Sequence, residues 1–206
     1  MLDPSIPRFF DCSIIRFLLP NSPTSQLPNP LPLRQFSDIH SHCLSAGADT
    51  IINVPLHIDP WGDIAHFSYG IHPWDTADAD IDAMLSRVEA LAADPRVVAI
   101  GETGLDALRG APLDVQERIF LRHAAIAERV GKPLIIHAVR TAARIAELCR
   151  LQRPAVPWII HGFRGKPQFA RQLLAAGLSL SLGTHHNPET AAIVPPGRLY
   201  RETDAQ

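Results

Sequence analysis

Residues 97–137 read VVAIGETGLDALRGAPLDVQERIFLRHAAIAERVGKPLIIH. Two short apolar runs, 97–101 and 133–137, stand on either side of an amphipathic stretch in this segment. The stretch starts near Asp114, which we expect to cap a helix, and it stops at Gly131-Lys132-Pro133, where glycine and proline end helices. Near-continuous apolar runs suit strands that are buried on both faces, so the segment predicts a parallel β-α-β unit.

The same alternation extends over the chain from residue 36 onward. Short apolar runs are expected to form eight strands, at 36–40, 50–54, 66–71, 97–101, 133–137, 157–161, 178–182 and 199–203. Amphipathic stretches are expected to form helices at 80–93, 114–130, 141–151 and 166–176. Eight strands, the later ones alternating with helices, predict a (β/α)8 TIM barrel. A doubly wound sheet is the alternative, although we find no GxGxxG nucleotide loop.

The first three runs depart from the regular pattern. The segments that join them are too short for an ordinary crossover helix, and the sequence stops just after the eighth run. We therefore expect an abbreviated barrel that lacks two early crossover helices and the last helix. Residues 1–35 are rich in proline, so we expect a poorly ordered extension there and a barrel over 36–206.

Composition limits the function classes. The chain has 206 residues and a net charge of -2, which argues against a strongly basic DNA-coating protein. A nuclease stays possible, because a local basic rim is enough to hold a phosphate backbone. Cysteines occur only at Cys12, Cys43 and Cys149, and an odd number without a paired motif fits a reduced, cytoplasmic protein. No apolar run is long enough to span a membrane.

Ionisable side chains follow several of the expected strands. Active sites of (β/α)8 barrels lie at the carboxyl ends of the strands. Here those ends carry imidazoles and carboxylates, namely His40 and His42 after the first run, Glu102 after the fourth, His137 and His161 after the fifth and sixth, and Asp204 after the eighth. Imidazole and carboxylate are usual ligands of Zn²⁺ and Mn²⁺, while Mg²⁺ prefers oxygen. Packing does not explain six such groups, so we predict a divalent-metal centre.

The pair His40 and His42 is the strongest part of this pattern. Residues two apart in a strand point to the same side, so both imidazoles can converge on one ion. Asp38 lies one step deeper, where it would hydrogen-bond a ligand imidazole or balance charge. Taken alone, two histidines at this spacing are explained equally well by a metal site and by chance neighbours on the surface. The other strand ends favour the metal site.

Each of the other candidate ligands also has a plainer interpretation. By themselves, His137 and His161 suit core histidines and Asp204 suits a solvated charge near the end of the sequence. Glu102 suits either an acidic helix cap or a bridging ligand. Two flanking glycines, Gly101 and Gly104, would let a ligand approach and favour the second interpretation.

Further residues near the strand ends are candidates for substrate contacts. His72 would contact substrate or phosphate, or be a structural loop histidine. Asp106 would orient a catalytic group or pair with Arg140, or only stabilise its loop. Arg164 would meet a substrate anion or be a solvated cation. His185 and His186 follow the seventh run and suit exposed loop residues.

Six segments in order carry a resemblance to a known family. They are Asp38-Ile39-His40-Ser41-His42, Gly70-Ile71-His72-Pro73, Gly101-Glu102-Thr103-Gly104-Leu105-Asp106, Pro133-Leu134-Ile135-Ile136-His137, His161-Gly162-Phe163-Arg164-Gly165 and Glu202-Thr203-Asp204-Ala205. From about residue 36 to the end, the chain resembles the TatD family of metal-dependent hydrolases, within the amidohydrolase-like superfamily. It is similar to a shorter subgroup that trims the early helices. Arg164 stands where many members carry serine.

The resemblance implies a role for each ligand. His40, His42 and Asp204 would bind one metal, and Glu102 would bridge to a second metal completed by His137 and His161. The cofactors would be two divalent cations, Mg, Mn or Zn, and Asp204 would act as a base or orient the water. Members of the family are described as DNases or as hydrolases acting on ester bonds.

The sequence thus predicts a metal-dependent hydrolase that acts on ester bonds through a water activated by two metals. A TatD-like deoxyribonuclease with DNA as substrate is the main hypothesis. A hydrolase of small esters, amides or phosphoesters is one alternative, and a truncated, inactive pseudo-hydrolase with a binding role is another. We expect no obligate protein partner.

Overall fold

The computed structural model describes residues 33–58, 62, 64–77 and 80–204, and eight parallel strands form one sheet in chain order. The strands are β1 (Asp38–Ser41), β2 (Thr50–Asn53), β3 (Phe67–Tyr69), β4 (Val97–Asp106), β5 (Leu134–Val139), β6 (Trp158–Ile160), β7 (Ser179–Leu182) and β8 (Leu199–Arg201). The sheet curls into a nearly closed barrel. The predicted (β/α)8 class is therefore confirmed, and the doubly wound alternative is not.

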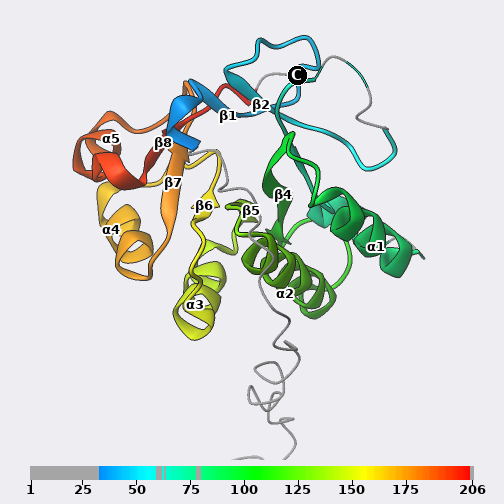
Figure 1. The fold of residues 1–206 in the computed structure, drawn as a ribbon. Coiled ribbons are helices and arrows are strands. Elements are labelled where there is room, and N and C mark those ends of the chain that lie inside the picture. Colours follow the sequence, from blue (N-terminus) through cyan, green and yellow to red (C-terminus); the bar gives the residue numbers. More distant parts are fainter. Residues whose placement is uncertain (1–32, 59–61, 63, 78–79, 205–206) are drawn as a thin grey trace, which may run out of the picture.

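Helices join the later strands. They are α1 (Ile81–Leu91), α2 (Leu113–Val130), α3 (Ala142–Gln152), α4 (Pro167–Ala175) and α5 (Pro188–Ile193). Figure 1 shows them along the outside of the strands. Within the described ranges no α-helix joins β1 to β2 or β2 to β3, and none follows β8, so the barrel is abbreviated as predicted. None of the helices described is both long and apolar enough to cross a bilayer.

Two expectations about these elements are wrong, and one helix was missed. Helix α2 begins at Leu113 after Pro112, so Asp114 is not its cap; it lies in the first turn and pairs with Arg118 at 2.9 Å. Strand β4 runs on to Asp106, past the predicted end at residue 101. Helix α5 was not located in the sequence, because six residues are too few for an amphipathic period. It is capped by Asn187, whose side chain accepts hydrogen bonds from two backbone N–H groups.

The two glycines beside Glu102 are needed for strand packing, a role that sequence reasoning did not find. Gly101 and Gly104 have φ of 130° and 149°. A Cβ atom would lie 2.4 Å from the Ile135 carbonyl oxygen at Gly101 and 2.0 Å from the His137 carbonyl oxygen at Gly104. Only residues without a side chain let β4 approach β5 this closely.

A layer of side chains fills the inside of the barrel. Ile51, Val98, Ile159 and Tyr200 belong to one buried cluster and come from the even-numbered strands β2, β4, β6 and β8, and Ile39 of β1 joins them. Side chains from alternate strands meet in this way inside a TIM barrel. Leu33 and Phe36, which precede β1, join the same cluster. Residues 1–32 of the predicted extension lie outside the described residues.

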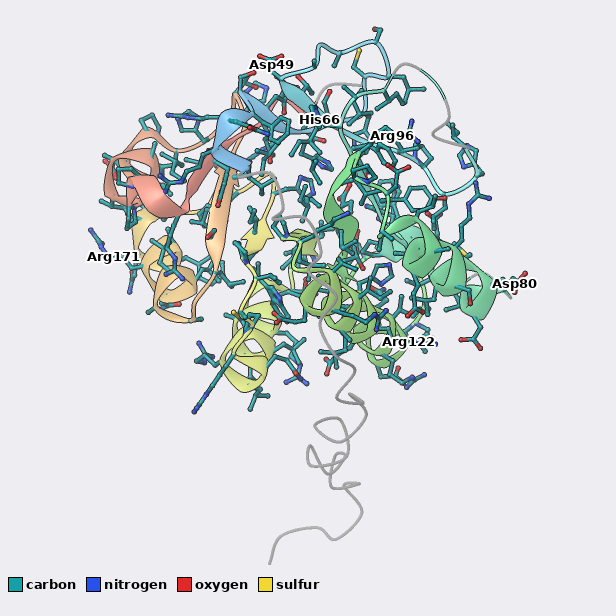
Figure 2. The ribbon with its side chains drawn as sticks, viewed as in Figure 1. Asp49, His66, Asp80, Arg96, Arg122 and Arg171 are labelled. Atoms are coloured by element: carbon teal, nitrogen blue, oxygen red, sulfur yellow. The ribbon has the colours of Figure 1, made fainter. Side chains whose placement is uncertain are left out.

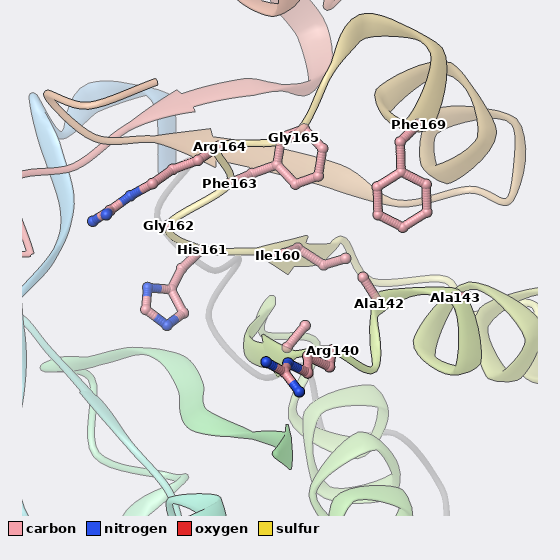
Figure 3. Close-up of a pocket in the computed structure, with 11 residues that line it drawn as sticks. Arg140, Ala142, Ala143, Ile160, His161, Gly162, Phe163, Arg164, Gly165 and Phe169 are labelled. Atoms are coloured by element: carbon pink, nitrogen blue, oxygen red, sulfur yellow. The ribbon is translucent and has the colours of Figure 1, made fainter. Parts of the chain in front are cut away.

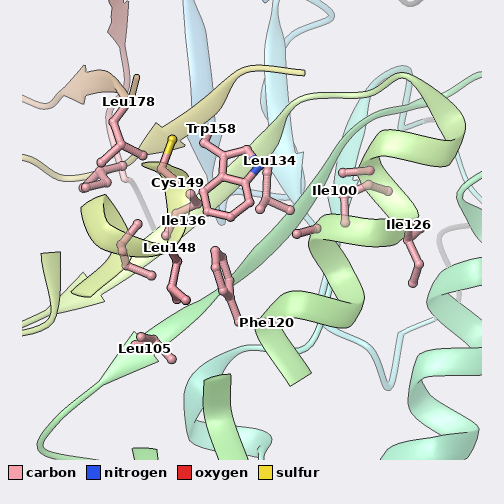
Figure 4. Packing of buried hydrophobic residues seen from close by; sticks show 14 of the residues in the cluster. Ile100, Leu105, Phe120, Ile126, Leu134, Ile136, Leu148, Cys149, Trp158 and Leu178 are labelled. Atoms are coloured by element: carbon pink, nitrogen blue, oxygen red, sulfur yellow. The ribbon is translucent and has the colours of Figure 1, made fainter. Parts of the chain in front are cut away.

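A second buried cluster lies between the strands and the helices (Figure 4). Phe120 of α2 and Trp158 of β6 meet edge to face, with 5.0 Å between their ring centroids. Leu134 and Ile136 of β5 and Cys149 of α3 belong to the same cluster. Burial of this apolar surface fixes the helices on the sheet and so fixes the ends of the strands.

Hydrogen bonds join the first strand to the segment after the last one. Asp38 accepts bonds from the Thr203 hydroxyl at 2.5 Å and the Thr203 backbone N–H at 3.2 Å. The backbone N–H of Asp204 donates to the carbonyl oxygen of His40 at 3.0 Å. Asp38 also accepts a bond from the backbone N–H of His40, so its partner is not the imidazole that we expected. These bonds nearly close the barrel and hold Asp204 beside β1.

His123 connects α2 to the segment that follows β3. The side chain is buried, its Nε2 accepts a bond from the Ile71 backbone N–H at 3.0 Å, and its Nδ1 lies 2.8 Å from the Ile119 carbonyl oxygen. Burial lowers the pKa of His123 to about 4, against the smaller opposing effect of the Ile119 hydrogen bond. The native protein therefore holds this histidine neutral beside Ile71.

We predict that Thr203→Val destabilises the protein by about 1–3 kcal/mol, because it leaves a buried carboxylate oxygen of Asp38 without its hydroxyl donor. The measurement is the free energy of unfolding in denaturant. Thr203→Ser is the matched control, since it keeps the hydroxyl and should stay close to the unchanged protein. Equal stability of the valine and serine variants would contradict the role of the Thr203 hydroxyl in joining β1 to the segment after β8.

We predict that His123 makes stability fall as the pH is lowered. Between pH 6.5 and about 4 the unfolded chain takes up a proton at this residue and the native protein does not, so the neutral form stabilises the fold above pH 6.5. The loss reaches about 3 kcal/mol near pH 4. His123→Gln keeps an acceptor and a donor but cannot titrate. The free energies of unfolding of the unchanged protein and the His123→Gln variant, plotted against pH, should converge or cross as the pH falls. Parallel curves would show that His123 does not cause the loss of stability.

Candidate metal centre

The carboxylate of Glu102 lies at the centre of the strand ends. It is on β4 and only 3% exposed. Its Oε1 atom lies close to imidazole nitrogens of three histidines, at 2.7 Å from His137, 2.8 Å from His161 and 3.3 Å from His72. These imidazoles come from β5, from the residue after β6 and from the segment after β3.

The other oxygen of Glu102 faces the first strand. Oε2 lies 3.3 Å from Nε2 of His40 and 3.8 Å from Nε2 of His42. The Oδ1 atom of Asp204 is 3.7 Å and 3.6 Å from the same two nitrogens. The two oxygens of Glu102 thus have two different sets of neighbours, one on the β1 and β8 side and one on the β5 and β6 side.

Asn53 and Ser68 hold the backbone of Glu102 in place. The Asn53 carboxamide oxygen accepts a bond from the Glu102 backbone N–H at 2.9 Å and from the Ser68 hydroxyl at 3.3 Å. Asn53 and Ser68 lie on the neighbouring strands β2 and β3. Sequence reasoning missed both residues. The available signal was an asparagine inside the apolar run 50–54, where a buried polar side chain needs a partner.

Charge compensation keeps Glu102 ionised. Burial alone would raise the pKa of Glu102, but the charge of His161 and hydrogen bonds from His137 and His161 hold this pKa well below its usual range. Burial would lower the pKa of His161, yet the charge of Glu102 and its hydrogen bond raise this pKa well above the ordinary value. Burial and the charge of His40 lower the pKa of His42. The buried carboxylate thus attracts positive charge to the centre.

His40 shows where a metal ion would fit. Both ring nitrogens are buried and neither makes a hydrogen bond within the described chain. Three groups have donor atoms within 4.8 Å of one another, namely His40 with His161 and Asp204, His40 with His42 and Glu102, and His72 with Glu102 and His137. The structure thus brings the six predicted ligands together and adds His72. A divalent cation would satisfy the nitrogens that the protein leaves unbonded.

Asp106 at the end of β4 contacts the far side of the His137 ring. Its Oδ2 atom lies 3.2 Å from His137 Nε2 and accepts a bond from the Trp74 indole N–H at 2.7 Å. The backbone N–H of Leu108 donates to Oδ1. Arg140 is not among its partners in the described residues, so that expectation is wrong. With Nε2 engaged by Asp106, Nδ1 of His137 is directed toward Glu102.

Glu202 stands behind His161 in a similar way, and sequence reasoning missed its role. The side chain is buried, lies 3.7 Å from His161 Nδ1 and accepts a bond from the Gly162 backbone N–H at 2.5 Å. Burial would raise the pKa of Glu202, but the neighbouring His161 imidazole lowers it. The signal in the sequence was a second carboxylate two residues before Asp204.

Other candidates lie apart from this cluster. Arg164 is exposed beside His161. His185 is exposed and His186 contacts the Gly183 carbonyl oxygen at 2.7 Å, which fits the interpretation of this doublet as loop residues.

Comparison with known proteins agrees with this geometry. The family model described as TatD related DNase matches residues 41–205. A relative named as an uncharacterised metal-dependent hydrolase TatD, from Mycobacterium tuberculosis, is 35% identical over 158 residues, which are 70% of this chain and 60% of the relative. A relative named as a 3'-5' ssDNA/RNA exonuclease TatD, from Cronobacter turicensis, is 35% identical over 147 residues, 66% of this chain and 55% of the relative.

A solved structure supports the fold. The TatD homologue YjjV of Escherichia coli K12 superposes with a TM-score of 0.67 at 24% identity, covering 84% of this chain and 80% of that one. The chain spans less than two thirds of the length of the curated relatives named above. The family match nevertheless covers most of the barrel, including every strand from β2 to β8. The chain belongs to the TatD family of metal-dependent hydrolases.

Proposed function

We propose that this protein hydrolyses phosphodiester bonds in single-stranded DNA with the help of two divalent cations. The observation that carries the proposal is the division of neighbours between the two oxygens of Glu102. A carboxylate with imidazoles at both oxygens is suited to bridge two ions. The relative named as an ssDNA/RNA exonuclease supports the choice of substrate.

The side chains present fit such a pair of ions. His40, His42 and Asp204 would hold one cation, His137 and His161 would hold the other, and Glu102 would bridge them. The unbonded nitrogens of buried His40 are the clearest sign of fit. Four imidazoles among the donors favour Zn²⁺ or Mn²⁺ over Mg²⁺. When bound, two such cations supply a water of lowered pKa and positive charge next to the phosphoryl oxygens.

The protein's own residues would supply binding, orientation and proton transfer. Asp204 is 39% exposed at the edge of the cluster, where its carboxylate would orient the attacking water and accept its proton. His72 and Arg164 would contact phosphoryl oxygens of the substrate. Asp106 and Glu202 would keep His137 and His161 in orientation, because a ligand imidazole is held by a partner on its other nitrogen.

We predict that Glu102→Gln lowers metal-dependent hydrolysis of single-stranded DNA by at least about 100-fold, because the amide removes the charge that holds both ions. Glu147→Gln, at an exposed carboxylate on α3, is the matched control. The assay is nucleotide release with Mg²⁺, Mn²⁺ and Zn²⁺, run beside a panel of small esters and amides. Hydrolysis of the esters but not of DNA would favour the small-substrate alternative. Two metal equivalents per chain are expected, and none would favour a binding role.

We predict that Asp106→Asn weakens metal binding by about 10–100-fold, the usual effect of losing a partner of a ligand histidine. The two carboxylate oxygens of Asp106 serve three donors, Trp74, His137 and the Leu108 backbone N–H, and an uncharged asparagine with one acceptor oxygen cannot serve them all. Competition with a chromophoric zinc chelator measures the affinity. An unchanged affinity would mean that Asp106 only stabilises its loop.

A further inference from the structure

A cavity beside the centre is not used by the ligands described above. It has a volume of about 340 Å³ and lies next to His161, between the ends of β5 and β6 and the start of α4. Its apolar lining includes Ala142, Ile160, Phe163 and Phe169 (Figure 3). The rings of Phe163 and Phe169 are 6.1 Å apart between centroids. Aromatic and aliphatic walls of this kind suit the flat, apolar face of a base.

Two arginines give the cavity a positive charge. Arg140 and Arg164 both line it, and the described residues of the lining include no carboxylate. Both side chains are exposed, and neither forms an ion pair with any residue in the described part of the chain. Other exposed arginines, such as Arg122 and Arg144, are paired with carboxylates. Two unpaired guanidinium groups beside an apolar hollow are suited to an anion that carries an aromatic group.

The backbone at Arg140 supports a binding role. Arg140 follows β5 directly and has φ of 57°, a left-handed conformation that is uncommon for a residue with a side chain. Unfavourable conformations of this kind are concentrated at functional sites. In Figure 3 the guanidinium groups of Arg140 and Arg164 extend on opposite sides of the His161 imidazole. A chain of phosphates that passes His161 would thus meet a cation on each side.

We propose that Arg140 and Arg164 bind the phosphates that flank the cleaved one, and that the cavity holds the nucleoside next to the cleavage site. This inference rests on the proposed phosphodiesterase function. A hollow of this volume is at the small end for ligand sites and accepts one unstacked nucleoside. A base inside a duplex is stacked and paired and cannot enter it. The cavity therefore selects single strands.

The experiment compares Arg140→Gln and Arg164→Gln with Arg171→Gln. Arg171 lies on α4, and Figure 2 shows it at the outer surface of the molecule, so it is the matched control. Binding of a fluorescein-labelled oligothymidylate is measured by anisotropy over a range of salt concentrations, with EDTA present to prevent cleavage. Each pocket variant should bind about tenfold more weakly, the effect of one charged hydrogen bond. The slope of log affinity against log salt should become shallower by about 0.7, the value for one phosphate on a single strand.

Charge retention and catalysis give two further readouts. Arg140→Lys keeps the charge and should keep the salt slope of the unchanged protein, which a merely structural role would not predict. For Arg140→Gln, kcat/KM should fall about tenfold more for the oligonucleotide than for bis(4-nitrophenyl) phosphate, which has no flanking phosphates.

The outcomes separate this inference from the function on which it rests. If the unchanged protein cleaves the oligonucleotide but both pocket variants bind it with the same affinity and slope as Arg171→Gln, the pocket is not a subsite and the proposed function stands. An equal loss of kcat/KM for the oligonucleotide and for bis(4-nitrophenyl) phosphate would also contradict the subsite, because it would assign the arginines to the cleaved phosphate. If the unchanged protein neither binds nor cleaves nucleic acid, both proposals fail.

Discussion

The site depends on one buried charge, the carboxylate of Glu102. A buried carboxylate is costly unless opposite charge and hydrogen bonds compensate it, and here His137 and His161 lie within 2.8 Å of it. These histidines belong to different βα units, so the compensation exists only when β4, β5 and β6 have paired in the sheet. Histidines must lose their protons to bind a metal, and a cation can then supply the positive charge that the carboxylate requires. The fold and the proposed chemistry therefore depend on the same group.

The two ends of the barrel meet at this site. Asp38 of β1 accepts hydrogen bonds from Thr203, and Asp204 donates its backbone N–H to His40. One proposed ligand thus reaches the centre from the last strand while two others come from the first. Loss of these bonds would disturb the closure and the ligand set together. Within the described residues no α-helix covers the connections between β1 and β3, so these polar contacts help to hold β1 against the end of the barrel.

The class of fold and the cluster of ligand candidates could be predicted because they depend on local rules. Apolar runs indicate strands, and the carboxyl ends of parallel strands converge, so His40, His137 and His161 could be brought together without a structure. The partners behind them could not. Glu202 faces His161 only after β8 has paired with β7 and β7 with β6, and Asp106 reaches His137 because β4 is five residues longer than expected. The packing role of Gly101 and Gly104 was missed for the same reason, since the atoms that a side chain would meet there belong to another strand.

The most direct test of this account is an anomalous diffraction experiment on crystals of the protein grown with Mn²⁺. The account predicts two peaks about 3.5–4 Å apart, each bonded to a different oxygen of Glu102. One should contact His40, His42 and Asp204, and the other His137 and His161. A single ion, no ion, or ions that do not touch Glu102 would contradict the account.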